Sequence, residues 1–223
     1  MERTISVTGK GRISLKPDLI RLMMELEGTF EDYGETLKQS SQQMEALKNM
    51  FEGLGFERGD VKTLSFNIDA EYQNYQDDDK SWKKRFVGYK FRHGFKLEFD
   101  IDNARLGKIL YALAHEKTCP EFHIFYTVKD GESAKDELLK NALKDSMKKA
   151  ELLSAAAGVT LGEIININYS FEDMKFLSVT TERLFDASCM RAAGTVADGA
   201  YDVNVEPDNI ELTDTVNVIW SIV

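Results

Sequence analysis

Apolar and polar residues alternate with a period of two along several stretches of this chain. The alternation covers residues 20–26, 64–72, 85–101, 122–128 and 210–222. Successive side chains of a β-strand point to opposite faces, so this pattern predicts strands with one packed face and one polar face. The pattern defines an architecture but supplies no chemistry.

Three capped helices are predicted between the strands. Asp32 with Glu35 three residues later resembles a capping box, and Asp102 suits the N-cap of a second helix. Ser133 with Asp136 can cap the third helix, whose apolar stripe is rich in alanine. Glycines are expected to end the first and third helices, at Gly53, Gly55 and Gly158.

Two polar segments are predicted to be turns. Gly9-Lys10-Gly11, after a short strand at residues 4–8, lacks the third glycine of a dinucleotide fingerprint and the ending of a P-loop. A tight turn between strands is therefore expected there. Residues 76–81 form the tip of a predicted hairpin. The adjacent aspartates 77–79 in it lack the alternating ligand spacing of a calcium loop, so we expect a solvated turn.

The order of elements predicts an α+β fold. One strand is followed by two βαβ units joined by the 76–84 hairpin, then by a helix and two separated strands. We expect a two-layer structure with a mostly antiparallel sheet, helices packed on one face, and a ferredoxin-like (split βαβ) βαββαβ arrangement. The chain, 1–223, is predicted to be a single domain with its core at 1–171 and 209–223. Residues 172–208 lose the periodicity but stay partly apolar, which indicates an irregular docking or interface segment.

The composition is that of an acidic, soluble globular protein. Lys and Arg number 28 against 38 Asp and Glu, which gives a net charge of -10. Such a charge repels nucleic acid and anionic membranes, and no apolar run approaches the roughly 20 residues of a membrane helix. The first residues hold no apolar stretch of the signal-peptide kind. We therefore expect a cytoplasmic protein as the sequence stands, or a periplasmic, exported one if the chain was trimmed.

The histidines and cysteines do not form a recognisable catalytic or metal-binding set. His93 lies on the apolar side of its strand, His115 near a helix C-terminus, and His123 on a polar side. A three-histidine zinc site requires all three to converge, and their predicted faces disagree. Cys119 and Cys189 lie in irregular segments and are expected to be inert thiols; the alternative is a single disulfide bridge between them. No catalytic, cofactor-binding or metal-binding residue is assigned.

A basic run on one strand has a structural explanation. Residues 83–85 lead into Lys90, Arg92 and Lys96 on the polar face, where other strands offer acidic residues. Opposite charges on neighbouring strands account for this without a ligand. An RNA-reading sheet carries aromatic residues on its open face. Here the aromatics are expected to point into the core, with Trp82 as the one exposed exception, so nucleic-acid binding is not expected.

Several short motifs span nearly the whole chain, with gaps at 72–86 and 172–208. They are Ile5–Gly11, Pro17-Asp18, Asp60–Thr63, Gly88-Tyr89, the stretch 142–162 and the final strand after Pro207. Together these motifs resemble the SIMPL-domain family, formerly a domain of unknown function. The resemblance implies an α+β domain that assembles into homo-oligomers, sometimes large rings. It also implies a bacterial, often exported protein, with members linked to stress tolerance or kinase signalling complexes. No catalytic motif comes with the family.

Two functional hypotheses follow. The first is a non-enzymatic, homo-oligomerising structural or interaction protein, with protein partners and a stress- or envelope-related role, and with no nucleic acid and no membrane insertion. The second is a small-molecule-binding protein or enzyme with a pocket beside residues 172–208. Its candidate polar groups would be Arg183, Asp186, Arg191 and Asp198.

Overall fold

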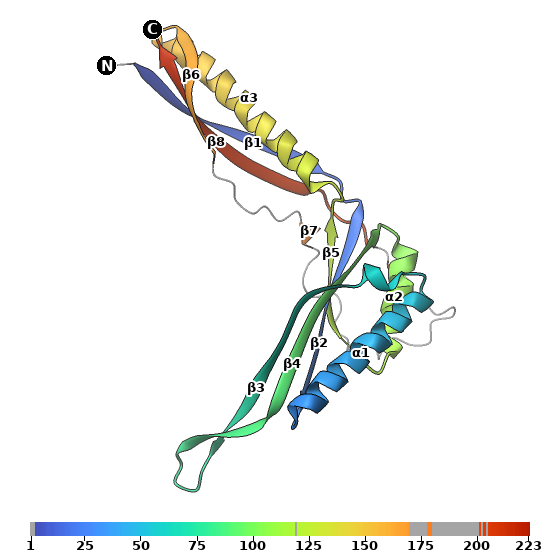
Figure 1. Ribbon diagram of the computed structural model, residues 1–223. Coiled ribbons are helices and arrows are strands. Elements are labelled where there is room, and N and C mark those ends of the chain that lie inside the picture. Colours follow the sequence, from blue (N-terminus) through green and yellow to red (C-terminus); the bar gives the residue numbers. More distant parts are fainter. Residues whose placement is uncertain (1–2, 119, 170–177, 180–200, 202, 204) are drawn as a thin grey trace. The chain divides into compact units, whose positions relative to one another are not determined.

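The computed structural model describes residues 3–118, 120–169, 178–179, 201, 203 and 205–223 (Figure 1). The chain divides into two compact units. Unit 1 comprises Met1–Asp18, Thr127–Ser178 and Pro207–Val223, and unit 2 comprises Leu19–Tyr126 and Val179–Glu206. The predicted α+β class is confirmed, but the strands form two sheets rather than the one expected. The prediction of a single domain over 1–223 stays a prediction.

Unit 2 contains the predicted ferredoxin-like arrangement. Its sheet has the strand order β3-β4-β2-β5-β7, and β2 and β3 each pair antiparallel with β4. The chain order βαββαβ with this strand order is the split-βαβ topology. The elements are β2 (Leu19–Phe30), α1 (Tyr33–Gly53), β3 (Lys62–Gln76), β4 (Trp82–Asp100), α2 (Asn103–His115), β5 (Glu121–Thr127) and the short β7 (Ser178–Val179), with a 3-10 turn at Arg58–Asp60.

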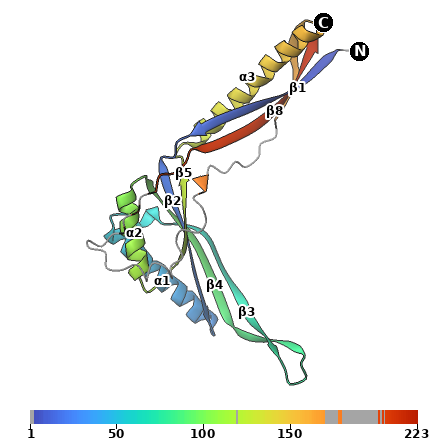
Figure 2. The ribbon, with the colours of Figure 1, turned by 180° about the vertical axis from the view of Figure 1, so that it is seen from behind.

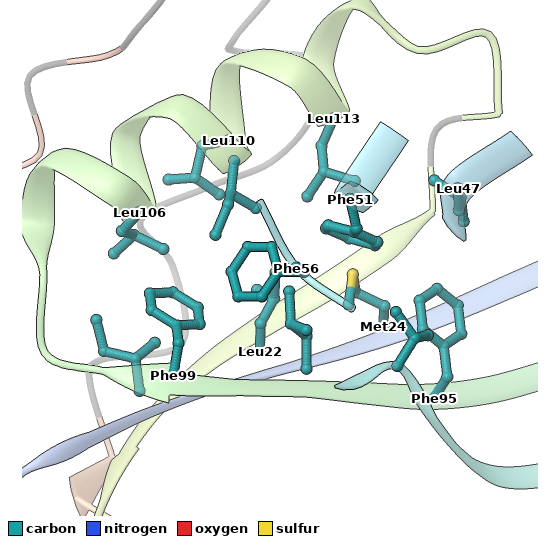
Figure 3. Packing of buried hydrophobic residues seen from close by; sticks show 14 of the residues in the cluster. Leu22, Met24, Leu47, Phe51, Phe56, Phe95, Phe99, Leu106, Leu110 and Leu113 are labelled. Atoms are coloured by element: carbon teal, nitrogen blue, oxygen red, sulfur yellow. The ribbon is translucent and has the colours of Figure 1, made fainter. Parts of the chain in front are cut away.

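Both helices of unit 2 contribute to one apolar core over the sheet (Figure 3). The period-two residues of β2 and β4 supply its floor, and the helical-period residues of α1 and α2 supply its cover. Asp32 and Asp102 cap these helices as predicted, accepting from the backbone N–H of Glu35 at 3.0 Å and of Arg105 at 2.9 Å. Fully buried members of the core include Leu22, Leu47, Phe51, Phe95, Leu106 and Leu110.

Unit 1 is a three-stranded sheet covered by one long helix. The strand order is β1-β8-β6, with β1 (Thr4–Leu15) and β6 (Leu161–Asn168) antiparallel to β8 (Ile210–Ile222). The helix α3 (Gly131–Ala157) packs on it through residues spaced four apart, namely Ala134, Leu138, Ala142, Ser146, Ala150 and Ser154. Asp130, rather than the predicted Ser133, is its N-cap, because the Asp130 carboxylate accepts from the Ser133 backbone N–H.

The turn predicted at Gly9-Lys10-Gly11 is wrong. These residues lie inside β1 and pair without interruption with residues 214–216 of β8. A Cβ on Gly9 would lie 2.0 Å from the carbonyl oxygen of Ala142, and one on Gly11 would lie 2.2 Å from that of Leu138. The glycines therefore serve close packing of α3 against the strand rather than a change of direction.

Side chains of α3 also satisfy the unpaired edge of β1. The Lys10 backbone N–H donates to Asp145 Oδ2 at 2.7 Å, and the Thr8 carbonyl accepts from Lys149 Nζ at 3.1 Å. Asn141, one turn earlier, donates to the Arg12 carbonyl at 3.5 Å. Since an open strand edge is a template for pairing with other chains, this cover protects one edge of the sheet.

Part of the segment 172–208 is described. The Tyr201 backbone N–H donates to the Gly107 carbonyl of α2 at 3.2 Å, and Asn103 donates to the Val205 carbonyl at 3.1 Å. Val203 is buried in the core of unit 2. A Cβ on Gly107 would lie 2.1 Å from the Tyr201 carbonyl oxygen, so a glycine in α2 permits this approach.

Candidate functional site

The hairpin of β3 and β4 continues past the start of α1, which both ribbon views show (Figures 1 and 2). The 21 residues of α1 span about 32 Å at 1.5 Å per residue, whereas the 19 residues of β4 span about 63 Å. One helix therefore cannot cover the length of this hairpin. We call its distal part, residues 70–89, the arm.

Four aromatic rings line the arm and the start of α1. Tyr33 meets Tyr89 edge to face, with ring centroids 5.3 Å apart, and Tyr89 meets Phe86 at the same distance. Phe86 in turn meets Tyr72 at 5.7 Å. Tyr72 is 54% exposed and Phe86 45% exposed. We call these four residues the aromatic row; it presents a continuous apolar surface to solvent.

A β-bulge places this row. The register of β3 and β4 shifts at Val87, since Glu71 pairs with Gly88 and Tyr72 with Phe86. Gly88 has φ +153°, and a Cβ there would lie 2.3 Å from the carbonyl oxygen of Phe30. Only glycine fits this backbone position. The bulge changes the direction in which the side chains beyond it point.

The expectation that the aromatic residues point into the core is wrong for the arm. In the arm, Tyr72, Tyr75 and Phe86 are exposed, in addition to the expected Trp82; outside it, Tyr33 and Phe66 are exposed as well. Alternation identifies the face of a strand, but burial also needs a second layer on that face. The sequence did contain a signal for this exposure. The predicted strand 85–101 is longer in space than the predicted helix 33–54, so the helix could not cover the whole strand.

The arm ends in a closed, charged turn. The Asp77 and Ser81 backbones are hydrogen-bonded at 3.0 Å, and the Lys80 N–H donates to the Asp77 carbonyl at 2.8 Å. Lys83 pairs with Asp77, and its hydrogen bond is the main reason that the pKa of the Asp77 carboxyl lies below its usual value. Asp78 and Asp79 are exposed, as the predicted solvated turn requires.

The open face of this sheet carries the cross-strand ion pairs expected from sequence. Lys90 Nζ lies 2.7 Å from Glu27, and Arg92 lies 3.4 Å from Asp69. Glu98 accepts from two cations, Arg21 at 2.5 Å and Lys96 at 3.0 Å. These acidic partners explain why Arg21, Lys90, Arg92 and Lys96 lie on this face. Lys84 and Arg85 make no ion pair with the described residues.

The three histidines occupy separate environments. His93 Nε2 lies 3.1 Å from Thr63 Oγ1, and its ring packs edge to face on Phe66. Burial, with a smaller contribution from the Lys48 charge, lowers the pKa of His93. His115 Nδ1 lies 2.8 Å from the Tyr111 carbonyl oxygen. Among the described residues, no three His, Cys, Asp or Glu side chains are grouped so that they could hold a metal ion.

The residues named for the alternative, pocket-based hypothesis fall outside the described part of the chain. These are Arg183, Asp186, Arg191 and Asp198, and the two cysteines, Cys119 and Cys189, fall outside it as well.

The unit 1 sheet has a shallow depression of about 520 Å³ where β6 meets β8. Beside it, Tyr169 donates its hydroxyl to Asp214 at 2.8 Å. The lining offers hydroxyl and amide groups rather than a set suited to acid–base catalysis. It is formed by Thr8, Ile167, Asn168, Tyr169, Thr215 and Asn217.

None of the helices described here is both long and apolar enough to cross a membrane.

The fold and the arm define an α+β protein with a ferredoxin-like unit and an exposed aromatic surface. The model of the SIMPL family, whose description reads "Protein of unknown function (DUF541)", matches residues 5–220. The chain belongs to that family.

Two curated relatives are bacterial. The chain is 27% identical over 166 residues to the "26 kDa periplasmic immunogenic protein" of Brucella melitensis and 26% identical to the protein of the same name from Brucella abortus. Each match covers 74% of this chain and 65% of the relative, so the chain spans less than two thirds of the length of these relatives.

Proposed function

We propose that this protein is a non-enzymatic structural protein that self-associates through the arm. The observation that carries the proposal is the aromatic row, a run of neighbouring rings of which Tyr72 and Phe86 are about half exposed. A buried Phe or Tyr removes about 150–250 Å² from water, so a few such rings supply much of the apolar core of a standard interface.

The edge of the sheet supports the same proposal. β3 is the terminal strand of its sheet, and most of its 15 residues are exposed. A long edge strand with apolar side chains is a template for strand pairing unless something covers it. In unit 1, α3 side chains cover the β1 edge; among the described residues β3 has no comparable cover.

A second copy of the chain is the occupant that the charges favour. The arm carries acidic residues at its turn, and close by it carries Lys84 and Arg85, which make no ion pair within the described part of the chain. Both signs therefore lie on one segment, which suits pairing with an identical chain. A polyanionic partner is disfavoured by the net charge of -10.

Sedimentation velocity on two variants tests this proposal. Tyr72→Ser with Phe86→Ser removes the centre of the aromatic row and should shift the protein from assembled to monomeric species. The matched control is Ile101→Ser, which removes a 37% exposed apolar side chain outside both the arm and α3 and should leave the assembly unchanged. An unchanged sedimentation coefficient in the arm variant would refute a role for the row.

The location of the protein is a further part of the proposal. The printed names of the Brucella relatives include the word periplasmic, which favours an exported, periplasmic protein over the cytoplasmic expectation. Fractionation of cells that express the native gene should place the protein with periplasmic markers, and recovery with cytoplasmic markers would reject this assignment.

A further inference from the structure

A second exposed apolar surface lies on unit 1, where α3 does not extend over β6. Ile164 pairs with Trp220 and Ile167 with Val218, so both isoleucines share the face of the sheet that α3 covers. They are nevertheless 41% and 47% exposed. The helix packs mainly over β1 and β8, which leaves the β6 margin of that face open.

The flank of α3 away from β1 is also apolar. Leu143 and Met147 follow the buried Ala142 and Ser146 by one position, a rotation of about 100°. Asn141 and Asp145, which reach the β1 edge, precede the same buried residues by one position. Leu143 and Met147 therefore lie on the opposite flank, toward β6, and are 36% and 50% exposed. With Ile164 and Ile167 they form what we call the α3–β6 surface.

A row of lysines borders this surface. Lys140, Lys144 and Lys148 each follow a buried residue by two positions, so they line the solvent side of α3. All three are exposed, and none makes an ion pair with the described residues, unlike Lys149, which pairs with Asp145. Three such cations in a row give this side of α3 a local positive charge on a chain with a net charge of -10, which suits an acidic partner.

The tip of the arm has the complementary chemistry. Asp78 and Asp79 are exposed and make no ion pair with the described residues. Trp82 is 73% exposed and Tyr75 41% exposed beside them. The tip thus offers two carboxylates next to two large apolar rings, while the α3–β6 surface offers three ammonium groups next to four apolar side chains.

We propose that the arm tip of one copy, residues 75–82, docks on the α3–β6 surface of another copy, with Asp78 and Asp79 against the lysine row and Trp82 on the apolar residues. The two surfaces differ, so the contact is heterologous and each copy uses its tip on one neighbour and its α3–β6 surface on another. This inference rests on the proposed self-association and names the surface that receives the arm.

Charge reversal with analytical ultracentrifugation tests the inference. Lys144→Glu with Lys148→Glu, and separately Asp78→Lys with Asp79→Lys, should each weaken assembly by about tenfold or more, because attractive pairs become repulsive ones. The chain carrying all four substitutions should assemble again. The control, Lys108→Glu with Lys117→Glu on exposed positions outside α3, should assemble like the wild type.

Mixing the two reversed proteins gives a second readout. In the mixture the acidic tip of the lysine variant meets the intact lysine row of the other protein, and the two reversed surfaces also attract each other. The mixture should therefore assemble with equal amounts of the two proteins, although neither protein assembles alone. If wild-type protein is assembled and the lysine variant assembles equally well, this docking is wrong while self-association stands. A strictly monomeric wild type rejects both. Lysine variants that assemble normally but lose binding to phosphatidylglycerol vesicles would instead assign the row to a lipid surface.

Discussion

At the residue scale, glycine is used in this protein where another backbone comes within van der Waals contact. Gly9 and Gly11 let α3 lie against β1, and Gly88 lets the bulged strand pass the Phe30 carbonyl. Of these three, only Gly88 also has a positive φ. The motifs that gave the family resemblance, Gly9-Lys10-Gly11 and Gly88-Tyr89, thus have a packing explanation.

Gly9→Ala should destabilise unit 1 by roughly 1–3 kcal/mol, because the new methyl group must displace the Ala142 backbone. Urea denaturation followed by circular dichroism measures the change. Gly53→Ala is the matched control, since its Cβ would meet no atom within 4 Å and should leave the midpoint equal or slightly higher. Equal midpoints for wild type and Gly9→Ala would contradict the close packing.

His93 should make stability depend on pH. Its pKa in the folded protein lies below the usual 6.5, mainly because of burial, so the unfolded chain binds a proton that the native protein does not. This contribution is fully present above pH 6.5 and declines as the pH falls through the window below it. Denaturation at pH 7 and pH 5.5 should therefore show a smaller loss of stability for His93→Gln than for wild type. Parallel losses would contradict this.

At the scale of elements, β1 and β3 are both edge strands with unpaired backbone groups, and they differ in how that edge is covered. Asn141, Asp145 and Lys149 recur every four residues on α3 and reach successive unpaired backbone groups of β1. Tyr169 lies at the far margin of the same sheet. Burial is the main cause that raises the pKa of its hydroxyl, and the hydrogen bond to Asp214 is the second cause. One edge is thereby closed within the chain, whereas β3 stays open at the end of its own sheet.

Asp145→Ala should speed hydrogen exchange of the Lys10 amide by roughly 10- to 150-fold, because a hydrogen bond to a charged acceptor contributes about 1.5–3 kcal/mol. Exchange measured by NMR at single-residue resolution tests this. Asp136→Ala, an exposed position on the same helix, should leave the Lys10 rate unchanged. If both variants exchange at the wild-type rate, α3 does not protect this edge.

Local chemistry made the helices and most strands predictable. The carboxylates of Asp32 and Asp102 and the glycine at 158 act over one turn of chain, so their roles could be inferred from neighbouring residues. The continuation of β1 through Gly9–Gly11 depends on α3, more than 120 residues away, and could not. Exposure of Tyr72 and Phe86 depends on where α1 begins relative to the arm, again a tertiary property.

At the scale of the whole molecule, charge and apolar surface are separated in a way that favours assembly. The chain has a net charge of -10, yet α3 and the strand beside the arm turn each carry a local group of cations that make no ion pair with the described residues. Exposed aromatic residues gather on the arm, and aliphatic residues on the α3–β6 surface. Contiguous exposed apolar patches of this kind mark interaction sites more often than they mark the surface of a monomer.

Multi-angle light scattering of the wild-type protein across a wide concentration range tests the central claim most directly. Self-association predicts a molar mass that is a multiple of 25.3 kDa and that falls only on dilution. A mass of 25.3 kDa at every concentration would contradict the account.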